Sequence, residues 1–149
     1  MTARELFEDA RAASWELHRH DLKYDAMERR ALSLGCSIAT VPRGSIRDRM
    51  ARVDAMVDYS AMMEQREREW CATIDGAYAV LYGDDWQHGI AKSLSLTHAE
   101  VLECIYIQRM TLPQTARRVH WSTRKVCDLR REAFAFIDRV GIDLAIAGK

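Results

Sequence analysis

The first 34 residues carry apolar side chains at alternating spacings of four and three. These positions are Leu6, Ala10, Ala13, Leu17, His20, Tyr24, Met27, Ala31 and Leu34, and the apolar pattern is broken only by His20. Heptad spacing held over four repeats is typical of a long helix that packs along one side against another helix. The residues between these positions are largely charged, as a solvated face should be. We therefore expect a helix over residues 2–34, ended by Gly35.

A second long helix is expected from Ser45 to about Tyr82. Pro42 and Gly44 place a linker over residues 36–45, and Asp48 completes a capping-box-like pattern with Ser45. Two long helices joined by ten residues most simply fold back as an antiparallel hairpin. Because a hairpin alone has a thin core, we expect its seam to serve also as an oligomer interface. The apolar stripe of this helix is predicted at Ile46, Met50, Val53, Val57, Ala61, Ile74, Ala77 and Leu81.

The sequence changes character after the polar segment 83–89, which is predicted as a loop. Thr97 and Glu100 form a capping box before a helix of about 99–108, and Thr111 and Gln114 form another. Ser122 is expected to cap a third helix that runs to about residue 140. The chain is thus predicted to be all-α, with a hairpin over 1–83, a linker over 84–95, a compact three-helix domain over 96–140 and a tail over 141–149.

Composition narrows the class of protein. Only two prolines occur in 149 residues, which suits long helices. Because no apolar run approaches 18 residues and the N-terminus carries acids in place of a signal sequence, we expect a cytoplasmic protein without membrane association. Its four cysteines form no CxxC pair and are expected to be reduced.

Charge is distributed unevenly along the chain. The formal net charge is zero, yet residues 1–96 hold 13 basic and 16 acidic side chains. Residues 111–131 hold six basic side chains and one acidic, which gives this short segment a net charge of +5. Such a concentration of positive charge is typical of a surface that binds phosphates.

The same segment meets the steric demands of a helix-turn-helix. Two helices that cross steeply over a short turn need a small residue where they touch, and Ala116 occupies that position. Val119 and Trp121 are expected to bracket the turn, and Val126 and Leu129 to face inward from the following helix. His120 stands where glycine is usual because a left-handed backbone is needed, which histidine tolerates at modest strain.

With Val126 and Leu129 pointing inward, the exposed face of the last helix is expected to be polar and basic. It comprises Ser122, Thr123, Arg124, Lys125, Cys127, Asp128 and Arg131. Arginine can bind guanine edges in the major groove, while hydroxyl and backbone N–H groups bind phosphates. The sequence therefore predicts a DNA-binding surface in preference to an ordinary pair of surface helices.

Residues 96–138 resemble region 4 of sigma-70-type RNA polymerase sigma factors. The resemblance is carried without a gap by YIQRMTL, TARRVHWSTRKV and REAFAFI, residues 106–112, 115–126 and 131–137. The whole chain is similar in layout to the small phage- and prophage-encoded sigma-like regulators of the RinA and ArpU kind, including the PRGS linker at residues 42–45.

This resemblance implies a transcription regulator that binds double-stranded DNA, with RNA polymerase as a further candidate partner and a homodimer or tetramer formed through the N-terminal helices. It implies base or phosphate contacts by Ser122, Thr123, Arg124, Lys125, Asp128 and Arg131, and approach to the DNA backbone by Thr111, Gln114 and Arg118. No aromatic-rich segment like the one with which full sigma factors bind the −10 element is present, so independent promoter melting is not expected.

Other functions have weaker sequence support. Asp84, Asp85 and His88 are better explained as a polar loop than as a catalytic or metal site, and no catalytic residue, metal or cofactor is expected. A phage DNA-packaging module of the small-terminase kind remains an alternative, since it also combines a helix-turn-helix with oligomerising helices. A protein–protein adaptor without DNA affinity is the second alternative.

Overall fold

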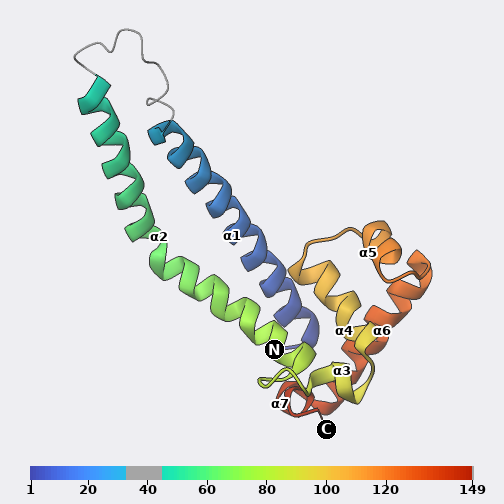
Figure 1. The fold of residues 1–149 in the computed structure, drawn as a ribbon. Coiled ribbons are helices and arrows are strands. Elements are labelled where there is room, and N and C mark those ends of the chain that lie inside the picture. Colours follow the sequence, from blue (N-terminus) through green and yellow to red (C-terminus); the bar gives the residue numbers. More distant parts are fainter. Residues whose placement is uncertain (33–44, 149) are drawn as a thin grey trace. The chain divides into compact units, whose positions relative to one another are not determined.

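The computed structural model describes residues 1–32 and 45–148, and every regular element within them is a helix (Figure 1). The long helices are α1 (Ala3–Leu32) and α2 (Ser45–Tyr82). The shorter elements are α3 (Gly89–Ser93), α4 (Leu96–Leu102), the π-helical turn η2 (Glu103–Ile107), α5 (Leu112–Arg118), α6 (Thr123–Val140) and α7 (Ile142–Ile146). The all-α prediction is confirmed. The predicted cap Gly35 and most of the predicted linker lie outside the described residues.

None of the helices in residues 1–32 and 45–148 has the length and apolar character needed to cross a membrane.

Most helix boundaries follow the local sequence signals. The third short helix ends at Val140 as predicted, and α2 begins at Ser45 as predicted. The helix expected from residue 99 instead begins at Leu96, because Ser95 caps it by accepting a hydrogen bond from the His98 N–H. The predicted tail forms α7, whose Ala145 is fully buried.

The chain divides into two compact units that do not follow the predicted domain boundaries. The first unit comprises Met1–Trp15 and Trp70–Lys149, and the second comprises Glu16–Glu69. The predicted linker 84–95 contains α3, whose Ile90 is fully buried in the core of the first unit. The packing of α3 requires glycine at position 89. Gly89 has a φ of +70°, and a Cβ atom there would lie 2.5 Å from the Leu81 carbonyl.

The first unit has its core between the N-terminal turns of α1 and the helices that follow residue 95. Phe7 is fully buried, with its ring centroid 5.7 Å from that of Tyr106 and 5.9 Å from that of Phe134. The Ala3 N–H donates to Asp138 Oδ1 over 2.8 Å, and the Ser14 hydroxyl donates to the Ile107 carbonyl over 2.7 Å. Helices α4, α5 and α6, which cover the predicted three-helix domain, therefore do not form a core by themselves, because α1 supplies part of it.

The second unit consists of the remaining parts of α1 and α2. The predicted seam of α1 is withdrawn from solvent there, with His20 and Ala31 buried and Tyr24 and Met27 half-buried. Of the stripe predicted for the first half of α2, Val53 is half-buried, but the prediction is wrong at Met50, Val57 and Ala61, which are exposed. The buried or half-buried positions of α2 keep a heptad spacing through Val53, Met56, Ser60, Met63, Glu67, Trp70, Ile74, Ala77 and Leu81.

Two polar residues of these seams meet in the second unit. His20 Nδ1 lies 2.9 Å from Glu67 Oε1, and the imidazole stacks on Tyr59 with ring centroids 5.3 Å apart. Apolar spacing does not predict the seam of α2 correctly, because Ser60 and Glu67 occupy seam positions where the pattern expects Leu or Val. The polar position in the seam of α1 is matched by a polar position in the seam of α2.

Candidate nucleic-acid interface

The start of α5 is stabilised by the predicted capping box. The Thr111 N–H donates to Gln114 Oε1 over 2.8 Å, and the Gln114 N–H donates to the Thr111 hydroxyl over 3.4 Å. Pro113 lies in the first turn, where its missing N–H leaves no hydrogen bond unmade. The resemblance assigns Thr111 and Gln114 to contacts with the DNA backbone. Both residues are exposed, and their side chains form the capping box at the surface.

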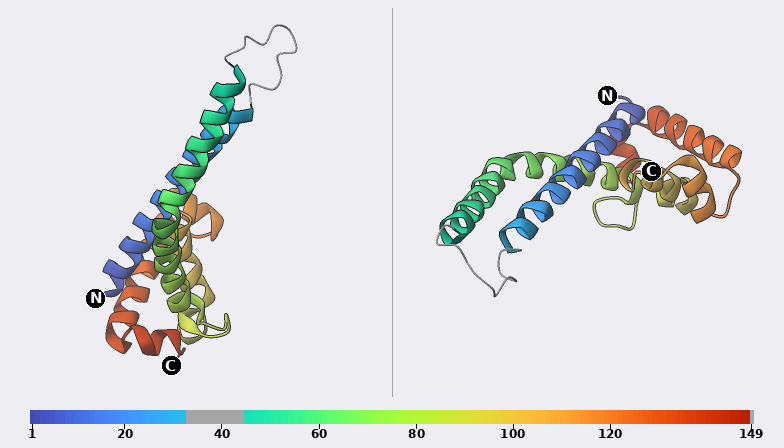
Figure 2. Two further views of the ribbon diagram at one scale, coloured as in Figure 1. Left: turned by 90° about the vertical axis from the view of Figure 1, so that its left-hand side faces the viewer. Right: turned by 90° about the horizontal axis from the view of Figure 1, so that it is seen from above.

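A turn of four residues connects α5 to α6, and Figure 2 displays the two helices from further directions. His120 has a φ of +57°, the left-handed backbone that the sequence predicted at this position. The Trp121 N–H donates to the Ala116 carbonyl over 3.0 Å, which closes the turn against the end of α5. This left-handed residue redirects the chain so that α6 can begin immediately after the turn.

The inward positions of α5 and α6 are occupied largely as predicted. Ala116, Val126 and Leu129 are buried, and Val119 is half-buried against the core. Trp121 is the exception, since 52% of its surface is exposed. Trp121 therefore lies at the turn, as expected, but takes no part in the buried core. Its indole lies at the surface, directly before the N-cap of α6.

The first turn of α6 presents hydroxyl and basic side chains to solvent. Ser122 is the N-cap and its hydroxyl accepts a hydrogen bond from the Lys125 N–H over 3.2 Å. Thr123 and Arg124 are exposed and Lys125 is half-buried. The N-terminus of a helix of this length carries unpaired N–H groups and a partial positive charge, which adds to the charge of these side chains.

One face of α6 continues this surface along the helix. Arg124, Asp128 and Arg131 are spaced by four and three and so share that face. The Arg131 guanidinium donates to the Asp128 carboxylate within the helix. Asp128 therefore neutralises part of the positive charge two turns into α6, and the charge at the start of the helix is left to Arg124 and Lys125.

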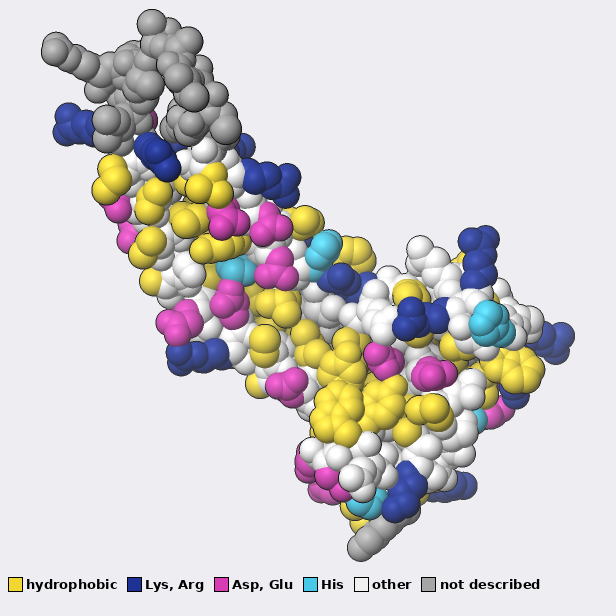
Figure 3. All heavy atoms as spheres, viewed as in Figure 1, with side chains coloured by type: hydrophobic (Ala, Val, Ile, Leu, Met, Phe, Trp, Pro, Cys, Tyr) yellow, Lys and Arg dark blue, Asp and Glu magenta, His cyan; other side chains and the backbone are white. Residues whose placement is uncertain are grey.

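Two other basic residues of the segment 111–131 lie near side chains of η2. Arg118 lines a cleft of about 360 Å³ together with Glu100, Glu103 and Cys104. Burial raises the pKa of the Cys104 thiol, and the nearby Arg118 guanidinium opposes that rise. Arg130 lies against the Tyr106 phenol, whose pKa is raised by burial and lowered in part by that guanidinium. Figure 3 nonetheless shows Lys and Arg side chains gathered around α5 and its adjoining turn.

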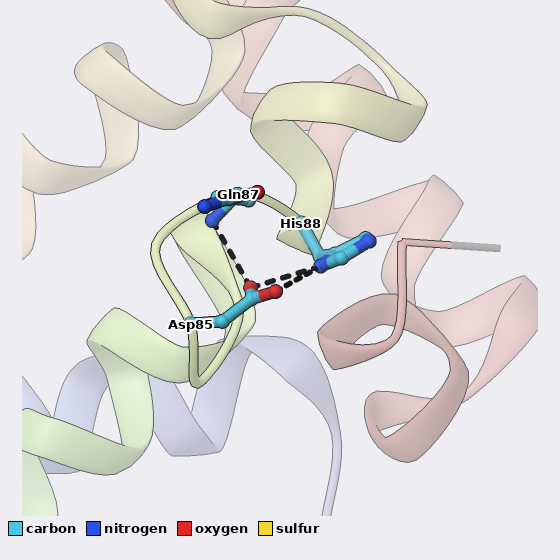
Figure 4. A network of polar contacts seen from close by, with 3 residues as sticks. All are labelled: Asp85, Gln87 and His88. Atoms are coloured by element: carbon cyan, nitrogen blue, oxygen red, sulfur yellow. Dashed lines mark hydrogen bonds and ion pairs between the residues drawn. The ribbon is translucent and has the colours of Figure 1, made fainter.

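The polar loop before α3 forms a closed network among its own residues (Figure 4). The Asp85 carboxylate accepts from the Gln87 N–H over 3.0 Å and lies 2.7 Å from His88 Nδ1. The His88 hydrogen bond, followed by that from Gln87, lowers the pKa of Asp85. Asp84 is not part of this network. No group of three or more His, Cys, Asp or Glu side chains in residues 1–32 and 45–148 is placed to hold a metal ion.

Replacing Ala116 with leucine should destabilise the protein by about 1–3 kcal/mol. The Ala116 side chain is buried in the core and its carbonyl closes the turn, so a larger side chain would force α5 away from α6. The measurement is the free energy of unfolding from urea titration. Exposed Ala135 of α6 provides the control, because Ala135→Leu adds the same atoms at the surface. Equal stability of the two variants would show that α5 and α6 do not pack as described.

Comparisons with protein-family models, with curated proteins and with solved structures give no match to this chain.

Proposed function

We propose that this protein is a sequence-specific DNA-binding transcription regulator in which α5, the turn and α6 act as a helix-turn-helix. The observation that carries the proposal is the first turn of α6, where Ser122, Thr123 and Arg124 are exposed while Val126 and Leu129 are buried. A recognition helix needs one side held by the core and the other side, at its N-terminal end, free to enter a major groove.

Each exposed group at the start of α6 suits a particular part of DNA. The hydroxyls of Ser122 and Thr123 and the free N–H groups of the first turn can bind phosphate oxygens. Arg124 can donate two hydrogen bonds to the edge of a guanine, and Lys125 can neutralise a phosphate. The basic side chains of α5 would approach the adjoining backbone. These roles assign α6 to base contacts and α5 to positioning.

Trp121 adds a contact that the sequence-based interpretation missed. Its exposed indole stands directly before the N-cap of α6 and beside the hydroxyl and basic side chains. An apolar side chain at this position can contact a thymine methyl group in the major groove. We expect Trp121 to contribute to the preference for one DNA sequence over another.

We further propose that this protein is cytoplasmic and forms an oligomer through the N-terminal helical hairpin. Large apolar side chains remain exposed on the parts of α1 and α2 within it: Leu22, Leu32, Met50, Val57 and Met62. Several exposed apolar side chains on one small unit are typical of a surface that is covered in an assembly. A dimer would also present two recognition helices, as operators with two half-sites require.

Size-exclusion chromatography with light scattering, without and with sheared DNA at low and high salt, tests this proposal. A dimer or tetramer whose DNA complex dissociates as salt rises is expected, because phosphate contacts release counterions. A ring of many subunits would instead favour DNA packaging. Absence of DNA binding at low salt would contradict the proposal and would favour the protein–protein adaptor instead.

Replacing Trp121 with alanine should lower the affinity for a selected DNA site by roughly tenfold while leaving affinity for random DNA nearly unchanged. The indole would contact bases and not phosphates, so its loss should reduce discrimination. Fluorescence anisotropy with both DNAs measures this ratio. Trp86→Ala is the matched control, since Trp86 is also exposed but lies outside the segment 111–131. A ratio that Trp121→Ala leaves unchanged would remove Trp121 from the interface.

A further inference from the structure

Three aromatic rings form a continuous stack at the end of α2. The Tyr78 and Tyr82 ring centroids lie 6.4 Å apart, and the Trp86 ring lies 5.5 Å from Tyr78 and 5.6 Å from Tyr82. We call these three residues the aromatic stack. Figure 3 shows hydrophobic side chains gathered over the end of α2, with acidic side chains beside them. An aromatic surface of this kind is not needed to close the core, because Trp86 is 67% exposed.

The loop after α2 holds Trp86 in this exposed position at some conformational cost. Trp86 has a φ of +60°, which is uncommon for a residue other than glycine. Its N–H donates to the Gly83 carbonyl over 3.3 Å, and the His88 N–H donates to the Tyr82 carbonyl over 2.9 Å. The network of Asp85 with Gln87 and His88 closes the same loop. The loop therefore keeps a large indole fixed at the surface in a strained backbone conformation.

Carboxylates flank the aromatic stack on two sides. On one side, Asp75 and Asp84 line a hollow of about 190 Å³ together with Tyr78 and Trp86. On the other side, Tyr82 lines the cleft that contains Glu100 and Glu103. The Tyr82 hydroxyl donates to Glu103 Oε2 over 2.5 Å, and Gln108 Nε2 donates to Glu103 Oε1 over 2.8 Å. Both carboxylate oxygens of Glu103 thus accept hydrogen bonds, and one of these bonds holds Tyr82 in the aromatic stack.

The remaining carboxylates are free to meet a cation. Asp75, Asp84 and Glu100 are exposed and form no ion pair within the part of the chain that the structure describes. Burial is the largest cause of the raised pKa of both Tyr78 and Tyr82, and among the smaller causes the charge of Asp75 acts on Tyr78 and that of Glu100 acts on Tyr82.

We propose that the aromatic stack and its flanking carboxylates form a docking surface for an arginine or lysine side chain of a partner protein. Aromatic faces attract guanidinium and ammonium groups, and carboxylates beside them pair with the same charge. A DNA phosphate would be repelled by Asp75, Asp84 and Glu100, so this surface is not a second DNA site. The proposal goes beyond DNA binding and does not depend on it.

The test uses a blocked peptide of alternating arginine and glycine as the probe, and the same peptide with citrulline in place of arginine as the uncharged control. Titration of the full-length protein is followed by the indole and backbone N–H resonances in nitrogen-15 correlation spectra, and the backbone resonances report on the variants that lack the Trp86 indole. The Trp86 resonance should shift with the arginine peptide and not with the citrulline peptide. Trp86→Ala, and separately Asp75→Asn with Asp84→Asn, should weaken binding roughly tenfold, while Trp86→Phe should retain most of it.

Trp121→Ala is the matched control variant, because it removes another exposed indole, from a surface without this acidic flank. Its affinity for the arginine peptide should equal that of the unaltered protein. Equal binding by the Trp86→Ala variant, or equal binding of the citrulline peptide, would overturn the proposal. A smaller oligomer for Trp86→Ala in light scattering would also overturn it, since the surface would then be covered by a second copy of this chain.

Discussion

Replacing Phe7 with alanine should lower the free energy of unfolding of the first unit by about 3–5 kcal/mol. Phe7 is fully buried, and its ring packs against both Tyr106 and Phe134. Its removal would leave a cavity between α1, η2 and α6 that these elements could fill only by moving. Urea unfolding followed by circular dichroism measures the loss.

A control on the same helix separates this effect from a general weakening of α1. Leu22 is exposed in the second unit, and Leu22→Ala should change the free energy of unfolding by no more than about 0.5 kcal/mol. If Phe7→Ala cost no more than Leu22→Ala, the start of α1 would not belong to the core of the first unit. The three helices after residue 95 would then be an independent domain, as the sequence alone predicted.

Replacing both Arg124 and Lys125 with alanine should weaken DNA binding roughly thirtyfold or more, from about 1–3 kcal/mol for each side chain. Both lie in the first turn of α6, where no acidic residue neutralises them as Asp128 does Arg131. Loss of phosphate contacts should also flatten the dependence of the affinity on salt. Fluorescence anisotropy over a series of salt concentrations measures both quantities.

The matched control removes the same charge elsewhere. Arg47 and Arg49 are exposed at the start of α2 in the second unit, so their replacement by alanine changes the net charge equally. That control should keep nearly all of the affinity and of the salt dependence. If the two double variants bound DNA equally well, α6 would not be the recognition helix and net charge alone would account for the binding.

Local signals predicted the elements around the candidate interface well. The capping box of Thr111 and Gln114, the cap at Ser122 and the left-handed backbone at His120 each depend on a few neighbouring residues, and all are present. The burial of Ala116, Val126 and Leu129 also followed from their spacing. The exposure of Trp121 did not follow from spacing, because spacing indicates a direction but not how much of a side chain is covered.

The aromatic stack had a weak signal in the sequence. Tyr78 and Tyr82 are spaced by four, which places them on one side of a helix, and Trp86 follows at the same interval. Trp86 lies beyond the end of α2, so helical periodicity could not place it. Its position depends on the loop hydrogen bonds and on the close approach of Gly89 to the backbone of Leu81.

The sequence by itself determined the helical class, the ends of most helices and the inward face of α1, because caps, breakers and heptad spacing act over a few residues. Only the tertiary structure decided which surfaces meet. It placed Phe7 in a core with residues more than 90 positions away, passed the seam of α2 through Ser60 and Glu67, and set Arg118 beside a cleft with Glu100 and Glu103. These outcomes depend on shape and charge complementarity between segments distant in the chain, which local patterns do not contain.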